Sequence, residues 1–428
     1  MKRIGNLFER VVDRDNLRLA FLKASRGKRH RDDQRRFEAN LEVELTRLRE
    51  GLLAGDYPVG DYRRFTIFDP KEREICAASF GERVLQHALM NVCEPYFDRW
   101  MVAQTFASRT GMGQTAAVTQ ARACAARHAW FLKADFRKYF DSIPHIGIQR
   151  LLARRFKDRA VLDWFFRILA AYEKTPGRGL PIGNLTSQFF ANLYLDALDR
   201  EVLGRGFAYV RYMDDFVAWS DDRRRLVELR AELTAFARDV LDLAFKQVPY
   251  VNRTRHGMDF LGMRIFPQSV RLSRASKLRY SRTVRAYEWR FAHGRMGERE
   301  LQDRLTALTA FTLQAEAAAW RRRQMAARKE LRATTASTAA AAGTTTPRTA
   351  APRTATGTTP ATATTTWASA SLAPQHRRNE SLAVPAGGQL PKGTKTTDAT
   401  ALVGMADAVA ERSGASPFPE CVIEEVET

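Results

Sequence analysis

Three aspartates have the side-chain type and setting to support metal-dependent chemistry. Asp214 and Asp215 stand together between residues 207–211 and 216–219, and Asp135 follows the apolar run 130–134. The aromatic and β-branched residues of these runs predict short strands, so the acidic pair would occupy a hairpin turn. Adjacent carboxylates repel each other unless a cation lies near them. Oxygen-only ligands suit Mg²⁺, and two ions about 3.5–4 Å apart can clamp an in-line phosphoryl transfer.

The alternative for an Asp-Asp pair is a solvated turn without function. The apolar flanks of Asp214 and Asp215 argue against that alternative, because a solvated turn does not require them. The third acid, Asp135, also stands at the predicted end of a buried strand. We therefore expect the three carboxylates to meet at the end of one sheet.

A second predicted hairpin, over residues 63–75, has Asp69-Pro70 in its turn. Lys71 and Arg73 are two positions apart, so they would share one face of the strand. Cationic groups in such a place can offset charge that develops on a transferred phosphoryl group. A surface hairpin without function is the alternative.

Two further stretches combine glycine with a predicted element. Residues 179–183 form a Gly/Pro loop that runs into an apolar helix containing Ser187 and Gln188. A helix start can direct backbone N–H groups at a nucleotide or a template base, although a simple loop–helix cap would look the same. Residues 260–265 read as a hairpin with Gly262 at its bend.

Taken in order, these motifs resemble those of reverse transcriptases. Tyr212-Met213-Asp214-Asp215 is similar to the Tyr-X-Asp-Asp motif of that family, and Asp135 resembles its first metal-binding aspartate. The resemblance covers roughly residues 1–330. It implies an α+β right-hand polymerase fold, with an antiparallel palm sheet, mixed fingers and a helical thumb. The expected divisions are a helical leader (1–60), fingers and palm (61–265), thumb (266–332) and a disordered Ala/Thr-rich tail (333–428).

The resemblance also implies residue roles. Asp135, Asp214 and Asp215 would be the catalytic acids and would bind two Mg²⁺ ions, with Mn²⁺ as a substitute. Phe140 would exclude a ribose 2′-hydroxyl, although an ordinary core phenylalanine is the alternative. The other implied positions contact the incoming nucleotide (Lys71, Arg73, Gly183, Ser187, Gln188) or form a primer grip (Phe260, Leu261, Gly262).

The stretch Ile182-Gly183-Asn-Leu-Thr-Ser187-Gln188 separates subfamilies. Group II intron and retron enzymes usually have Gln-Gly-x-x-x-Ser-Pro there, whereas this stretch resembles diversity-generating retroelement enzymes. That resemblance implies error-prone copying of an RNA template into cDNA, with a small basic accessory protein as partner. A group II intron or retron enzyme and a catalytically inactive RNA-binding relative remain alternatives.

The charge balance favours nucleic acid as a partner. The chain has 428 residues and a net charge of +21, and residues 1–332 alone carry +22. A basic surface suits a protein that tracks phosphate backbones, here template RNA, a cDNA–RNA hybrid and dNTPs. The four scattered cysteines predict neither a zinc site nor disulfides, and there is no apolar run long enough to span a membrane. We therefore expect a cytoplasmic protein, and the family resemblance implies that a bacterium or phage encodes it.

Overall fold

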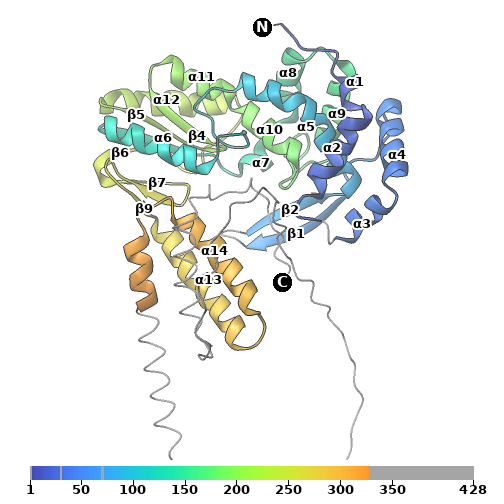
Figure 1. The fold of residues 1–428 in the computed structure, drawn as a ribbon. Helices are drawn as coiled ribbons and strands as arrows, with labels where there is room; N and C mark the ends of the chain where they lie inside the picture. Colours follow the sequence, from blue (N-terminus) through green and yellow to red (C-terminus); the bar gives the residue numbers. More distant parts are fainter. Residues whose placement is uncertain (1, 29–30, 69–71, 327–428) are drawn as a thin grey trace, which may run out of the picture. The chain divides into compact units, whose positions relative to one another are not determined.

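The computed structural model describes residues 2–28, 31–68 and 72–326 (Figure 1). Lys71 and the predicted tail 333–428 lie outside the described residues. Among the described residues, no helix combines the length and apolar character needed to cross a bilayer.

The described residues form α-helices, β-strands and a short 3₁₀ helix at Thr254–His256. The helices are α1 Phe8–Val11, α2 Arg14–Ser25, α3 Asp32–Ala39, α4 Leu41–Ala54, α5 Phe80–Trp100, α6 Gln114–Arg127, α7 Tyr139–Ser142, α8 His145–Arg155, α9 Arg159–Ala170, α10 Leu185–Tyr194, α11 Asp196–Gly204, α12 Arg223–Asp239, α13 Arg274–Ala292 and α14 Glu298–Thr312. The strands are β1 Tyr62–Phe68, β2 Glu72–Ala78, β3 Trp130–Asp135, β4 Ala208–Tyr212, β5 Asp215–Ser220, β6 Tyr250–Arg253, β7 Met258–Phe260, β8 Met263–Ile265 and β9 Val270–Leu272.

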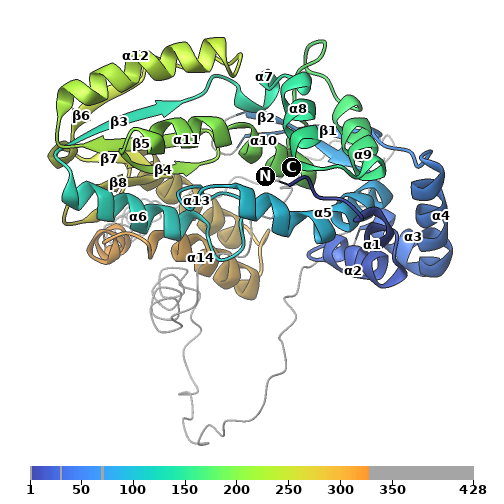
Figure 2. The ribbon, with the colours of Figure 1, turned by 90° about the horizontal axis from the view of Figure 1, so that it is seen from above.

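A four-stranded antiparallel sheet positions the acidic residues, and its strand order is β4-β5-β3-β6. Helices α12 and α6 lie on opposite sides of this sheet (Figure 2). Side chains alternate between the two faces of a strand. Leu132, Ala134, Phe216 and Ala218 belong to the large hydrophobic core, so the opposite face of β3 and β5 carries Lys133, Asp135 and Asp215.

Two smaller antiparallel sheets complete the strand content. Strands β1 and β2 form a hairpin, and β7, β8 and β9 form a three-stranded sheet. The combination of helices with small antiparallel sheets confirms the predicted α+β class and is consistent with a polymerase fold.

The described residues fall into two compact units. The first contains residues 2–285 and 310–317, with all of the sheets, and the second contains 286–309 and 318–326. The first unit holds every sequence-predicted site residue that the structure describes.

His87 lies in α5, the long helix that packs against α2 and α10. Burial, together with the nearby cations Lys23, Lys28 and Arg83, lowers the pKa of His87 from 6.5 to about 4. Below pH 6.5 the unfolded chain therefore binds a proton that the folded chain does not. The folded state must lose stability as the pH falls from about 6.5 towards about 4.

We expect the free energy of unfolding to fall by about 2 kcal/mol between pH 7 and pH 5 because of this histidine. Urea denaturation at the two pH values measures the change. His87→Gln should remove most of this difference, whereas His256→Gln, at an exposed position, should leave it intact. An equal pH dependence in wild type and His87→Gln would contradict the assignment.

Candidate active site

The hairpin β4–β5 carries two of the three aspartates. Tyr212 pairs with Asp215, so Met213 and Asp214 form the turn. Asp135 ends β3 and is directly opposite Asp215 in the antiparallel register. Paired residues of adjacent antiparallel strands point to the same face. The register therefore brings Asp135, Asp214 and Asp215 to the same end of the sheet.

The surroundings of the Asp214 and Asp215 carboxyl groups disfavour their ionised forms. Burial and the Asp135 carboxylate, with a smaller effect from Asp215, raise the pKa of Asp214 to about 6. Burial also raises the pKa of Asp215, and Lys133 opposes that rise. A divalent cation would favour the ionised form of each acid and so relieve this repulsion.

The three acids fit Mg²⁺ by donor chemistry, because all are hard oxygen ligands. The structure does not, however, group their side chains as a metal site requires. Among the described residues, no three His, Cys, Asp or Glu side chains are grouped around a point suited to a metal ion. Lys133 Nζ forms an ion pair with Asp215 Oδ1.

Two lysines lie beside the acids. Lys133 is two residues before Asp135 on β3, and its Nζ is also 5.1 Å from the centre of the Phe260 ring. Lys246 donates from its backbone N–H to the Asp135 carbonyl at 2.9 Å, and its Nζ is 3.3 Å from Asp135 Oδ2. Both lysines partly balance the negative charge of the acidic cluster.

Phe140 is half-buried in the short helix α7, beside the buried Tyr139. Its carbonyl accepts a hydrogen bond of 2.8 Å from the N–H of Leu180. The Gly/Pro loop that precedes α10 is therefore attached to the segment that follows Asp135. This attachment brings two stretches together that are about 40 positions apart in the chain.

The same loop contacts the β1–β2 hairpin. The Ile182 carbonyl accepts a hydrogen bond of 2.9 Å from Cys76 N–H. Gly183 has φ +114°, and a Cβ there would lie 3.1 Å from Ile75 and 3.3 Å from the Cys76 carbonyl. Only glycine suits both this backbone conformation and this close approach. Arg73 is exposed on the same strand β2.

Ser187 and Gln188 lie in the first turns of α10. Ser187 is 2% exposed, so its side chain faces the protein interior. Gln188 is half-buried, and its Oε1 accepts a hydrogen bond of 2.7 Å from Ser108 Oγ. The glutamine side chain is thus oriented by a residue from the loop before α6.

The hairpin β7–β8 has Leu261 and Gly262 at its turn, with φ +49° and +79°. Phe260 is 1% exposed, and the Leu261 carbonyl accepts a hydrogen bond of 2.7 Å from Gln114 Nε2. A Cβ at Gly262 would lie 2.9 Å from Ser276 Oγ and 3.0 Å from the Phe311 ring. This turn is therefore held rigidly, and Lys133 connects it to Asp215.

Part of the chain matches a known protein family. Residues 69–265 match the family model described as reverse transcriptase (RNA-dependent DNA polymerase). The chain contains a reverse transcriptase domain.

Relatives of the reverse transcriptase domain include several intron-encoded proteins. The chain is 26% identical over 165 residues to the putative COX1/OXI3 intron 1 protein of Saccharomyces cerevisiae, covering 36% of this chain and 20% of the relative. It is 27% identical to the group II intron-encoded protein LtrA of Lactococcus lactis, covering 38% and 28%. Protein YkfC of Escherichia coli is 24% identical, with 58% and 77% covered. The chain thus spans only about a fifth of the yeast relative.

Among solved structures, apo telomerase from Candida tropicalis matches with a TM-score of 0.39 and 10% sequence identity. The match covers 62% of this chain and 60% of that one.

Two side chains that contact the predicted site residues, those of Lys133 and Gln114, were not predicted from the sequence. Lys133 carried a signal, because it is a charged residue inside an otherwise apolar strand, two positions from Asp135. Gln114 had no comparable signal, since its contact with Leu261 joins residues 147 positions apart.

Arg211, in β4, forms a fully buried ion pair that was not predicted from the sequence. It is 0% exposed and forms a bidentate ion pair with Asp199, which is also 0% exposed, at 2.6 Å for each hydrogen bond. Burial alone would lower the pKa of this guanidinium, but Asp199 more than offsets burial and raises the pKa above its usual value.

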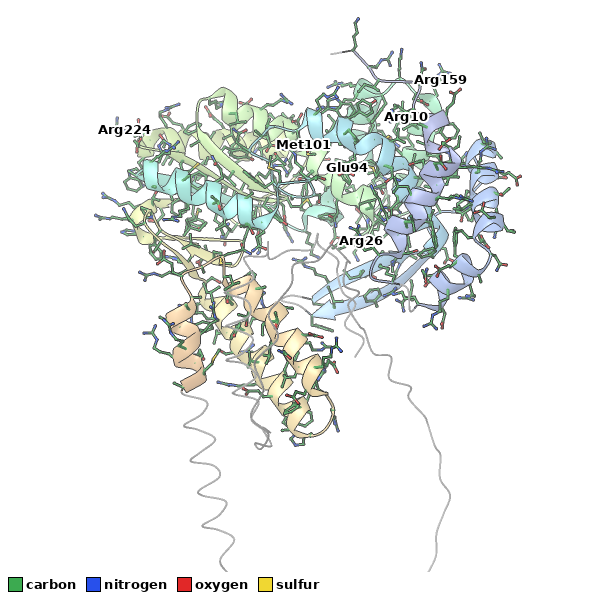
Figure 3. All side chains as sticks on the ribbon, viewed as in Figure 1. Arg10, Arg26, Glu94, Met101, Arg159 and Arg224 are labelled. Atoms are coloured by element: carbon green, nitrogen blue, oxygen red, sulfur yellow. The ribbon has the colours of Figure 1, made fainter. Side chains whose placement is uncertain are left out.

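Exposed arginines also lie on the surface of the first compact unit. Arg10, Arg159 and Arg224 are exposed on α1, α9 and α12, and Arg26 is exposed just after α2 (Figure 3). Exposed cations of this kind provide a non-specific attraction for a phosphate backbone.

Proposed function

We propose that this chain is an RNA-directed DNA polymerase that extends a primer 3′-hydroxyl with dNTPs on an RNA template. The observation that carries the proposal is the register of β3 against β5, which sets Asp135 opposite Asp215 and next to Asp214. The reverse transcriptase domain over residues 69–265 includes all three acids. RNA template, cDNA–RNA hybrid and dNTPs are the proposed partners.

Asp135 and Asp214 would bind two Mg²⁺ ions most directly, and Asp215 would complete the set. Bound metal would activate the primer 3′-hydroxyl and stabilise the leaving pyrophosphate. Mn²⁺ could substitute, because it accepts the same oxygen ligands. Lys133 would have to release Asp215 or remain as its counter-ion, and Lys246 is the proposed proton donor to pyrophosphate.

The remaining roles concern the substrates. Arg73, with Lys71, would hold the triphosphate, and Phe140 would exclude ribonucleotides. Gly183, Ser187 and Gln188 would contact the nucleotide or the template base. Phe260, Leu261 and Gly262 would form the primer grip.

Primer extension on a defined RNA template tests the proposal directly. The full chain should extend a DNA primer with dNTPs and Mg²⁺, and omitting the RNA template should abolish extension. Binding of the RNA–DNA hybrid without any extension would instead support the second candidate, a catalytically inactive RNA-binding relative.

Within this function, we propose the error-prone enzyme of a diversity-generating retroelement. The support is the stretch from Ile182 to Gln188. A group II intron-type or retron-type enzyme is the alternative, and the intron-encoded relatives favour the former. The same proposal includes a small basic accessory protein as partner. It also includes a cytoplasmic location, with the chain encoded by a bacterium or phage.

Sequencing of the cDNA products separates the subtypes. A retroelement enzyme of this kind should misincorporate opposite template adenine far more often than opposite the other three bases. A uniform error spectrum would remove the subtype while leaving the polymerase activity in place.

A further inference from the structure

The side chain of Arg211 links the acidic turn to the protein interior. Its Nη1 donates to the backbone carbonyl of Met213 at 2.9 Å and to Asn192 Oδ1 at 3.0 Å. Met213 is the first residue of the turn and is followed directly by Asp214. Arg211 therefore holds the peptide group that connects Met213 to Asp214.

This contact matters because the turn has an unfavourable backbone conformation. Met213 has φ +57°, a region that side chains other than glycine and asparagine seldom adopt. Such a conformation persists only where the surroundings impose it. A fully buried guanidinium that donates to the Met213 carbonyl supplies that constraint.

Arg211 is itself fixed from three directions. Asp199 on α11 accepts two of its hydrogen bonds. Asn192 on α10 and Thr105, whose Oγ1 is 3.2 Å from Nη2, accept others. Its backbone N–H donates to the Gln104 carbonyl at 2.9 Å. All of its N–H groups have partners, so the guanidinium has little freedom to rotate.

Asp199 is held as firmly as its partner. Tyr209 donates its hydroxyl to Asp199 Oδ1 at 2.8 Å, and Thr105 donates to Oδ2 at 2.8 Å. A charged pair removed from water needs such additional hydrogen bonds to keep its geometry. The network thus behaves as one rigid support behind the turn.

We infer that Arg211 is a positioning residue, which uses the buried Asp199–Asn192–Thr105 network to fix the Met213–Asp214 peptide and so aim the Asp214 carboxylate at a divalent cation. This inference rests on the proposed function for its catalytic consequence. It can be tested separately, because cation binding does not require polymerisation.

Arg211→Lys keeps the charge but cannot reproduce the forked hydrogen bonds to Asp199, Asn192 and Met213. In primer extension, kcat should fall about 100-fold, as expected for a misplaced catalytic group. The KM for dNTP and the Kd for an RNA–DNA hybrid should change less than about twofold, because no substrate contact is removed. The Kd for Mn²⁺, measured by electron paramagnetic resonance without substrates, should rise about tenfold.

Arg155→Lys is the matched control. Arg155 forms a largely buried ion pair of 2.7 Å with Asp196, and within the described part of the chain none of its hydrogen bonds goes to the acidic turn. A general loss of buried charge pairing would affect both variants alike. The inference requires that Arg155→Lys lower thermal stability while leaving kcat and Mn²⁺ binding close to wild type.

A milder pair of variants covers the case in which Arg211→Lys does not fold. Tyr209→Phe removes only the hydroxyl that supports Asp199, and kcat should fall about fivefold with weaker Mn²⁺ binding. Tyr194→Phe removes another buried hydroxyl, which donates to the Leu241 carbonyl at 2.6 Å, and it should change neither quantity. Equal kcat and Mn²⁺ binding in Tyr209→Phe and Tyr194→Phe would overturn the inference.

The same measurements separate this inference from the proposed function. If the wild type binds Mn²⁺ but does not extend primers, while the Arg211 or Tyr209 variants weaken Mn²⁺ binding, the positioning role stands and the polymerase proposal fails. If the wild type extends primers and the Arg211 and Tyr209 variants match their controls, the polymerase proposal stands and the positioning role fails.

Discussion

Replacing Asp214 with asparagine is expected to lower kcat for primer extension by at least about 10³-fold. The change preserves the size of the side chain but removes the charge that would bind both cations. Burial and the Asp135 carboxylate together raise the pKa of Asp214 to about 6, so this carboxyl group would gain most from a bound cation. The Kd for the RNA–DNA hybrid should remain within a fewfold of wild type, since the substitution removes no cationic contact to phosphate.

Steady-state extension with saturating hybrid measures the effect. Asp239→Asn is a suitable control, because Asp239 is an exposed acid at the end of α12 that pairs only with the neighbouring Arg238 among the described residues. Residual activity of Asp214→Asn within tenfold of wild type would remove Asp214 from the proposed metal site.

Substitution of Phe140 by alanine should relax the choice between deoxyribonucleotides and ribonucleotides. If the aromatic ring excludes a 2′-hydroxyl by steric clash, its removal should lower the discrimination in kcat/KM about 100-fold. The attachment of Leu180 to the Phe140 carbonyl should survive, because it involves only the backbone. Extension with dNTPs should therefore remain within a fewfold of wild type.

The measurement is the ratio of kcat/KM for a dNTP and the matching rNTP on one template. Tyr139→Phe is the control, since Tyr139 is the adjacent aromatic residue but is buried and donates its hydroxyl to the Ala191 carbonyl. Unchanged discrimination in Phe140→Ala would show that Phe140 is an ordinary core residue.

The roles of Asp214 and Phe140 were predicted on different grounds. Asp135, Asp214 and Asp215 were identified from acids at the ends of apolar runs, and the strands β3, β4 and β5 form there because β-branched and aromatic residues favour a half-buried pleated surface. Phe140 was assigned only by its distance from Asp135 along the chain. The structure places Phe140 half-buried in α7, which follows β3 and Asp135 along the chain.

The resemblance of its motifs to those of reverse transcriptases implied the α+β class. The residues by themselves determined the local features: the strands around the acids, the hairpin bend at Leu261-Gly262 and the excess of basic residues. These follow from hydrophobic periodicity, glycine positions and charge, all of which act over a few residues.

Only the tertiary structure decided which distant side chains meet. The ion pair of Lys133 with Asp215 spans 82 positions, and the Ser108–Gln188 hydrogen bond spans 80. Nothing in the sequence distinguished Arg211 from the other residues of its strand. In the structure it supports the acidic turn from the interior, because α10, α11 and the segment at Thr105 all contact its side chain. Strand register and helix packing set such contacts, and neither is encoded in any short stretch of the chain.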